Sequence, residues 1–164
     1  MVDPAHQSDG HLDLDLRALP VAAGTAVLVV DDDEAMRQLI ALRLRLLGHE
    51  IETASSVPAA IETLEARTIG AVVSDYSMPE ATGLELLSYV RLRGLPIPFV
   101  LMTGQLSTEL EGLALGRGAA IALDKDDLLD SLPDLFFFTG PPAFAPRPSR
   151  RRLRSPAAFA GASQ

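Results

Sequence analysis

The sequence predicts an α/β fold, a (βα)5 doubly wound parallel sheet. Short apolar runs alternate with helical segments five times along the chain, and this alternation is typical of βα units. The connections between the segments are short, which favours a parallel sheet with helices on both faces. The first apolar run, Ala26–Val30, contains no polar residue, as expected of a strand that is buried on both faces.

The predicted strands are short and end close to polar or charged residues. Pro98 lies at the start of the fourth strand, where a missing N–H donor is tolerated. The five predicted strands are, in order, 26–30, 50–54, 71–74, 97–102 and 119–123.

The predicted helices are indicated by apolar residues at helical spacing and by their end signals. The first begins with an acidic residue and ends at Gly48. Ser55 or Ser56 caps the second, and Ser107 caps the fourth. We expect the last helix to be less regular, because Pro133 interrupts it. The predicted helices are 34–47, the segment from the serine cap to about 67, 83–93, the segment from Ser107 to about 115, and 126–138.

One folded domain is expected between two unstructured ends. The chain has 164 residues, enough to bury a core without disulfides or metal staples. We expect a flexible leader over 1–24, a folded domain over 25–138 and a disordered tail rich in Pro and Arg over 139–164.

Composition excludes several classes of site and of protein. There is no cysteine, so disulfides, thiol nucleophiles and zinc–thiolate sites are excluded. No apolar run approaches the roughly 18 residues of a membrane span, and the N-terminus lacks the features of a signal peptide. We therefore expect a cytoplasmic protein with no membrane partner. Five of the 14 basic residues lie after residue 140, which leaves a strongly acidic body that is a poor nucleic-acid binder.

The chain contains a single lysine, Lys125, whereas its 13 other permanently basic residues are arginines. An ammonium is a compact point charge that suits one anionic oxygen, unlike the planar guanidinium. Lys125 is therefore a candidate for anion binding, and the alternative is an ordinary surface lysine among acids.

Polar side chains gather where the predicted strands end, and parallel sheets bind ligands beyond this edge. Crowded carboxylates repel one another unless a cation is present. A set of oxygen ligands favours magnesium or calcium over zinc, and an incomplete cage that keeps waters favours Mg²⁺. A hydroxyl and an ammonium beside the acids suit phosphoryl transfer. The residues concerned are Asp31, Asp32, Asp33, Asp75, Thr103 and Lys125.

Four motifs together resemble the receiver domain of a two-component response regulator of the single-domain type, over roughly 25–138. Each motif is weak alone, but the set is specific because the motifs occur in order at strand ends. They are Val-Leu-Val-Val-Asp-Asp-Asp-Glu (27–34), Val-Val-Ser-Asp-Tyr-Ser-Met-Pro-Glu-Ala-Thr-Gly (72–83), Val-Leu-Met-Thr-Gly (100–104) and Asp-Lys (124–125). The resemblance implies a flavodoxin-like receiver fold.

The resemblance also implies roles for particular residues. Asp75 would be the phosphoacceptor, and Thr103 and Lys125 would contact the phosphoryl group. The implied Mg²⁺ ligands are Asp31, Asp32, Asp75 and the backbone carbonyl of Ser77, with Asp32 a more direct ligand than Asp31.

The implied partners are a histidine kinase or phosphotransfer protein, which supplies the phosphoryl group, and a downstream protein target. A phosphorylation-dependent dimer is also compatible with the resemblance, whereas a nucleic-acid partner is not expected. Such a protein is not an enzyme beyond its own phosphorylation and autodephosphorylation.

The sequence departs from the family at two positions. Proline usually follows the conserved lysine, often after a cis bond, but Asp126 stands here. A non-proline cis bond costs about 3 kcal/mol, so we expect the bond between Lys125 and Asp126 to be trans. The family's aromatic switch residue is replaced by Ala122, so a rotating ring cannot couple to Thr103.

Two other functions are compatible with these residues. A pseudo-receiver would be an interaction module with a vestigial site, and Ala122 and Asp126 favour it. A haloacid-dehalogenase-like phosphohydrolase would use Asp31 as its nucleophile, with Asp33, Thr103 and Lys125 in support, but it leaves Asp75 unexplained. The glycine-rich motifs of nucleotide-binding proteins are absent from the sequence.

Overall fold

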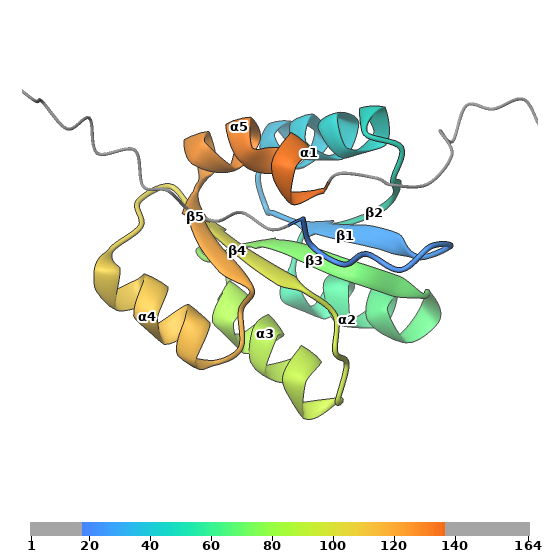
Figure 1. Cartoon of the computed structure of the whole chain (residues 1–164). Coiled ribbons are helices and arrows are strands. Elements are labelled where there is room, and N and C mark those ends of the chain that lie inside the picture. Colours follow the sequence, from blue (N-terminus) through green and yellow to red (C-terminus); the bar gives the residue numbers. More distant parts are fainter. Residues whose placement is uncertain (1–17, 137–164) are drawn as a thin grey trace, which may run out of the picture.

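The computed structural model describes residues 18–136, where five strands alternate with five helices (Figure 1). The strands are β1 (Ala26–Val30), β2 (Glu50–Ala54), β3 (Ile69–Asp75), β4 (Phe99–Thr103) and β5 (Ile121–Asp124). The helices are α1 (Glu34–Leu46), α2 (Val57–Ala66), α3 (Gly83–Leu92), α4 (Thr108–Gly116) and α5 (Lys125–Leu135).

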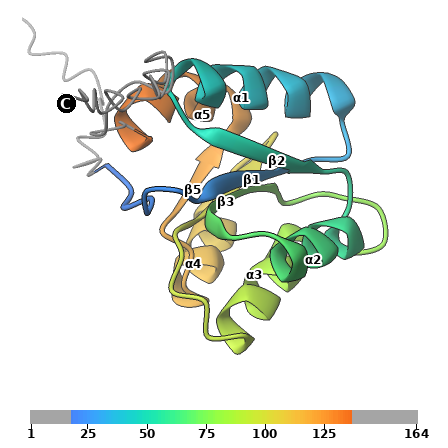
Figure 2. The same cartoon turned by 90° about the vertical axis from the view of Figure 1, so that its right-hand side faces the viewer.

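The strands form one parallel sheet in the order β2-β1-β3-β4-β5. Helices α1 and α5 cover one face, and α2, α3 and α4 cover the other (Figures 1 and 2). This confirms the α/β, doubly wound prediction. The strand order reverses between β1 and β3, because the chain builds outward from β1 in both directions. Such a switch point is where open parallel sheets bind ligands.

Strand β1 is buried on both faces, as its apolar sequence predicted. Side chains of successive strand residues point to opposite faces. Leu28 and Val30 accordingly lie in the core beneath α2, α3 and α4, whereas Val27 and Val29 lie in the core beneath α1 and α5. All five β1 residues are less than a tenth exposed, so the end of this strand is a rigid base for the residues that follow it.

Several element boundaries differ from the sequence prediction. Strands β4 and β5 each begin two residues later than predicted, at Phe99 and Ile121. Strand β3 begins two residues early, at Ile69, because Ile69 pairs with Ala26 of β1, a contact between distant residues. Helix α5 begins at Lys125 rather than Asp126 and runs through Pro133, so the predicted interruption is wrong. Proline removes only one hydrogen bond this close to a helix end, and the buried Leu132 and Leu135 fix the last turn.

The predicted leader and tail fall largely outside the described residues, which exclude 1–17 and 137–164. The domain boundaries therefore stay predictions. Within the described part, the Leu19 N–H donates to the Leu135 carbonyl oxygen at 2.7 Å, and Leu19 and Val21 pack against the core beneath α1 and α5. None of the described helices is long and apolar enough to cross a membrane.

Candidate functional site

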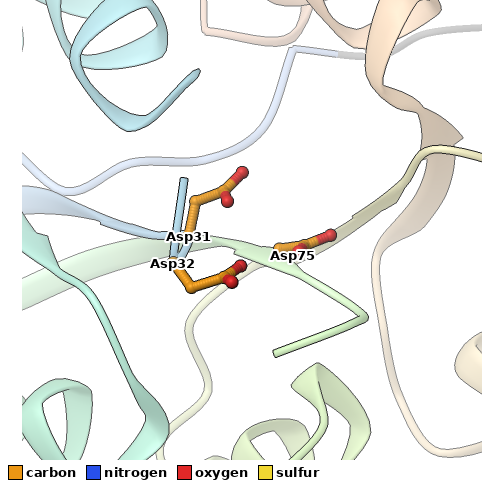
Figure 3. A group of neighbouring side chains, drawn as sticks. All are labelled: Asp31, Asp32 and Asp75. Atoms are coloured by element: carbon orange, nitrogen blue, oxygen red, sulfur yellow. The ribbon is translucent and has the colours of Figure 1, made fainter. Parts of the chain in front are cut away.

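Three carboxylates meet at the switch point of the sheet. Asp31 and Asp32 directly follow β1, and Asp75 is the last residue of the neighbouring strand β3. The strands pair with Val30 opposite Ser74, so their ends are level. One oxygen from each carboxylate lies within 4.8 Å of the others. Figure 3 shows the three side chains pointing in a common direction, beyond the strand ends.

Asp31 is fully buried and both of its carboxylate oxygens accept hydrogen bonds. The Asp33 N–H donates to Oδ1 at 2.9 Å, and the Lys125 ammonium donates to Oδ2 at 2.8 Å. The Arg37 guanidinium also donates to the Asp31 backbone carbonyl at 2.6 Å. The sequence interpretation missed Arg37, because an arginine in a first helical turn is too common to mark a site.

Asp33 has a different role from its two acidic neighbours. Its carboxylate caps α1 by accepting from the Met36 N–H at 3.0 Å. This hydrogen bond is the main reason that the pKa of Asp33 is lowered. Asp33 is also outside the group of three carboxylates that could hold a metal, so it serves the helix.

Asp75 and Lys125 are coupled electrostatically. The Lys125 Nζ lies 3.4 Å from an Asp75 carboxylate oxygen, and Asp75 is 3% exposed. Burial, assisted by the charge of Asp31, raises the pKa of Asp75 against the opposing effect of Lys125. Burial lowers the pKa of Lys125, but its hydrogen bond to Asp31 and the charges of both acids outweigh this, so the pKa is raised. The ammonium therefore stays charged between the two carboxylates.

Thr103 ends β4, one strand along from Asp75. Its hydroxyl lies 3.4 Å from the Gln105 nitrogen and 3.5 Å from the Gln105 carbonyl oxygen, which are long for hydrogen bonds. Ser77 lies in the loop between β3 and α3. That loop is fixed at Tyr76, whose N–H donates to the Met102 carbonyl at 2.7 Å and whose carbonyl accepts from the Gly83 N–H at 2.9 Å.

The two departures from the family pattern are visible in the fold. Ala122 is buried in the core beneath α2, α3 and α4 and has no ring that could rotate. No cis peptide bond occurs among the described residues, so the expected trans bond between Lys125 and Asp126 is confirmed.

The carboxylate group fits a magnesium ion. All its ligand atoms are oxygens, and the one ammonium leaves the three acids with excess negative charge. Magnesium prefers oxygen ligands in octahedral geometry and usually keeps several waters. Asp32 is exposed beside the buried Asp31 and Asp75, which leaves an open side for such waters.

The chain matches known response regulators in sequence. Residues 27–134 match the family model for the response regulator receiver domain. The chain is 36% identical over 109 residues to the response regulator protein FleR of Pseudomonas aeruginosa, an alignment that covers 66% of this chain and 23% of FleR. It is 33% identical over 109 residues to the transcriptional regulatory protein FixJ of Bradyrhizobium diazoefficiens, with 65% of this chain and 53% of FixJ covered. The chain thus spans a quarter to a half of these relatives.

The chain also matches solved structures. The chemotaxis protein CheY4 of Vibrio cholerae aligns with a TM-score of 0.60 and 27% identity, covering 68% of this chain and 98% of CheY4. The parallel sheet and five helices of the described residues are therefore a flavodoxin-like receiver fold. The family model covers well over half of the chain, and the carboxylates at its switch point lie inside the matched range. This chain belongs to the response regulator receiver domain family of two-component signalling.

Proposed function

We propose that this chain is a phosphoacceptor response regulator, which takes a phosphoryl group onto Asp75 and signals by binding another protein. The observation that carries the proposal is the Lys125 ammonium placed between the Asp31 and Asp75 carboxylates at the switch point. The same ammonium can pair with a phosphoryl oxygen once Asp75 carries the phosphoryl group as an acyl phosphate. Receiver domains work with histidine kinases and downstream effectors.

The proposed transfer forms one bond and breaks one. An ionised Asp75 oxygen attacks the phosphorus of a phosphohistidine on a histidine kinase or phosphotransfer protein. The P–N bond breaks, and the imidazole nitrogen keeps the electron pair and takes up a proton. Lys125 and the Thr103 hydroxyl would contact the transferred phosphoryl oxygens.

Mg²⁺ is the cofactor that we propose for the acidic group. Asp32, Asp75 and the Ser77 carbonyl would hold it, with Asp31 supporting the site. When bound, the ion neutralises the charge that gathers on the phosphoryl oxygens. The residues of the chain do the rest: Asp31 fixes the Lys125 ammonium, and the anchored loop after Tyr76 holds Ser77 near the phosphoacceptor.

The phosphohydrolase alternative is less well supported by the geometry. It needs Asp31 as the nucleophile, but the Asp31 carboxylate is fully buried and both oxygens are engaged by Asp33 and Lys125. The Asp75 carboxylate has a hydrogen bond with the Ser77 backbone and a contact to Lys125 at 3.4 Å. Lys125 therefore lies closer to Asp31, at 2.8 Å, than to Asp75, which leaves Asp75 the less tightly held of the two carboxylates.

Acetyl phosphate with magnesium tests the phosphoacceptor. Intact-mass analysis should show one phosphoryl group, and peptide mapping after borohydride reduction should place it on Asp75. Asp75→Asn should take up none. Label on Asp31 would favour the phosphohydrolase, whereas no label on a folded parent protein would favour a pseudo-receiver.

Calorimetric titration tests the metal site. Asp32→Asn should weaken Mg²⁺ binding by about tenfold or more, the scale of a perturbed metal ligand. Asp33→Asn is the matched control: it removes the same charge one residue away but leaves a side chain that still caps α1. An equal loss of affinity in both variants would show a general charge effect and not a ligand.

A further inference from the structure

Asp124 makes an unusual hydrogen bond for its position. It is the last residue of β5 and the N-cap residue of α5. An aspartate at an N-cap normally accepts from the N–H two or three residues later, as Asp33 does for α1. Asp124 makes no such bond. Its Oδ1 accepts instead from the Leu106 N–H at 2.7 Å, across 18 residues of sequence.

This bond joins the two segments of chain that carry the residues proposed to contact the phosphoryl group. Leu106 lies in the loop between β4 and α4, three residues after Thr103, and Asp124 directly precedes Lys125. Thr103 and Asp124 are also opposite each other in the register of β4 and β5. A displacement of the β4–α4 loop or of the junction between β5 and α5 therefore acts on the Asp124–Leu106 bond.

A phosphoryl group on Asp75 should pull on this loop. The Thr103 hydroxyl lies within 3.5 Å of the Gln105 backbone, so a hydroxyl that turns to a phosphoryl oxygen gives up these contacts. Gln105 directly precedes Leu106, so a displacement of the Gln105 backbone also displaces the Leu106 N–H. A charge-assisted hydrogen bond such as this one resists the movement, because a displaced Leu106 N–H loses a charged acceptor.

We infer that Asp124 is a positioning residue that holds the β4–α4 loop in its resting position and links it to the Lys125 end of α5. This inference rests on the proposed phosphorylation of Asp75. When Thr103 turns toward the phosphoryl group, the Leu106 N–H leaves the Asp124 carboxylate. That carboxylate is then able to cap α5. The Asp124–Leu106 bond thus links the loop after Thr103 to β5. Ala122 cannot make such a link, because it has no aromatic ring.

Titration with beryllofluoride, a phosphoryl mimic, tests the inference in the full chain with saturating magnesium. Because the bond favours the resting loop, Asp124→Ala should bind the mimic about tenfold more tightly than the parent, the scale of one charge-assisted hydrogen bond. Asp124→Asn keeps an acceptor oxygen and should lie between the two. Asp127→Ala removes an equal charge from the first turn of α5 and should bind as the parent does.

The NMR chemical shift of the Leu106 amide gives a second measurement. This shift would not respond to the mimic if Asp124 only stabilised the fold. The Leu106 signal should shift upfield in Asp124→Ala without the mimic, and the parent should show the same direction of shift when the mimic binds. A parent that binds the mimic while Asp124→Ala binds it equally or more weakly would overturn the inference and leave the phosphoacceptor intact. A parent that neither binds the mimic nor accepts phosphoryl groups would overturn both.

Discussion

Helices α3 and α4 cover the same face of the sheet but are held very differently. Helix α3 buries five of its ten residues, whereas α4 buries only Ala114 of nine. Leu113 and Leu115 of α4 are more than two fifths exposed. Helix α3 follows the Asp75 loop, and α4 follows the Thr103 loop. The difference indicates that Asp75 is followed by a firmly packed helix, whereas the helix after Thr103 is weakly packed. Displacing α4 should therefore cost less free energy than displacing α3.

The largest expected difference between the two helices is in the free energy of unfolding after one leucine of each is replaced by alanine. Leu87→Ala in α3 should lower the free energy of unfolding by about 2–5 kcal/mol, because Leu87 is fully buried. Leu113→Ala in α4 should change it by about 0.5 kcal/mol or less, since Leu113 is 43% exposed. Urea denaturation of both variants measures the difference. Similar losses would mean that α4 is packed as firmly as α3.

Glycines in the two helices give a second matched pair. A Cβ at Gly83 would clash with the Asp75 backbone carbonyl oxygen and come within 2.8 Å of a Leu101 methyl carbon, whereas one at Gly112 meets nothing within 4 Å. Gly83→Ala should therefore cost about 1–3 kcal/mol. Gly112→Ala should gain about 0.5–1 kcal/mol, because alanine is the better helix former.

Phosphorylation of these two glycine variants refines the comparison. Gly83→Ala displaces the carbonyl of the phosphoacceptor itself, so the rate of labelling by acetyl phosphate should fall together with stability. Gly112→Ala should be labelled at the parent rate. A slow Gly112→Ala variant would show that α4 contributes to the chemistry and not only to the response.

The carboxylate side of the site was predictable because local signals mark it. An apolar run followed by acids locates Asp31, Asp32 and Asp75, and parallel strands bring their ends to one edge. The partner of Asp124 was not predictable, because an aspartate before a helix reads as a cap and nothing in the sequence points to Leu106. The early start of β3 and the continuity of α5 through Pro133 also depend on contacts between distant residues.

A smaller effect on stability is expected from the charge of the buried Asp75 carboxylate. Because the pKa of Asp75 is raised by burial, the folded state binds a proton more tightly than the unfolded state. Ionisation of Asp75 therefore opposes folding above the unfolded pKa of about 3.9. Without divalent cations, Asp75→Asn should be more stable than the parent at pH 7, and this advantage should disappear as the pH falls through the raised pKa of Asp75 and toward the unfolded value.

Asp33 supplies a control of opposite sign. Its pKa is lowered by the hydrogen bond from Met36, so its ionisation favours folding, and Asp33→Asn should lose stability at pH 7 and recover as the pH falls. Thermal unfolding between pH 3 and pH 8 with a chelator measures both variants. Asp75→Asn less stable than the parent at pH 7 would contradict the effect of burial.

The smallest expected effect separates the loops that precede α3 and α4. Glu80, in the loop before α3, has a φ of 72°, in the left-handed region where a side chain costs about 1–2 kcal/mol. Glu80→Gly relieves this strain. It also increases the entropy of the unfolded chain, which costs about 0.5–1 kcal/mol of stability, so a net gain of about 0.5 kcal/mol is expected.

Gln105, in the loop before α4, is not among the described residues with positive φ. Gln105→Gly should therefore lose about 0.5–1 kcal/mol, with no strain to offset the entropy. Urea denaturation resolves the opposite signs. A loss in both variants would mean that surrounding contacts stabilise the conformation of Glu80 by as much as the strain costs. The loop between β3 and α3 would then be as firmly held as helix α3.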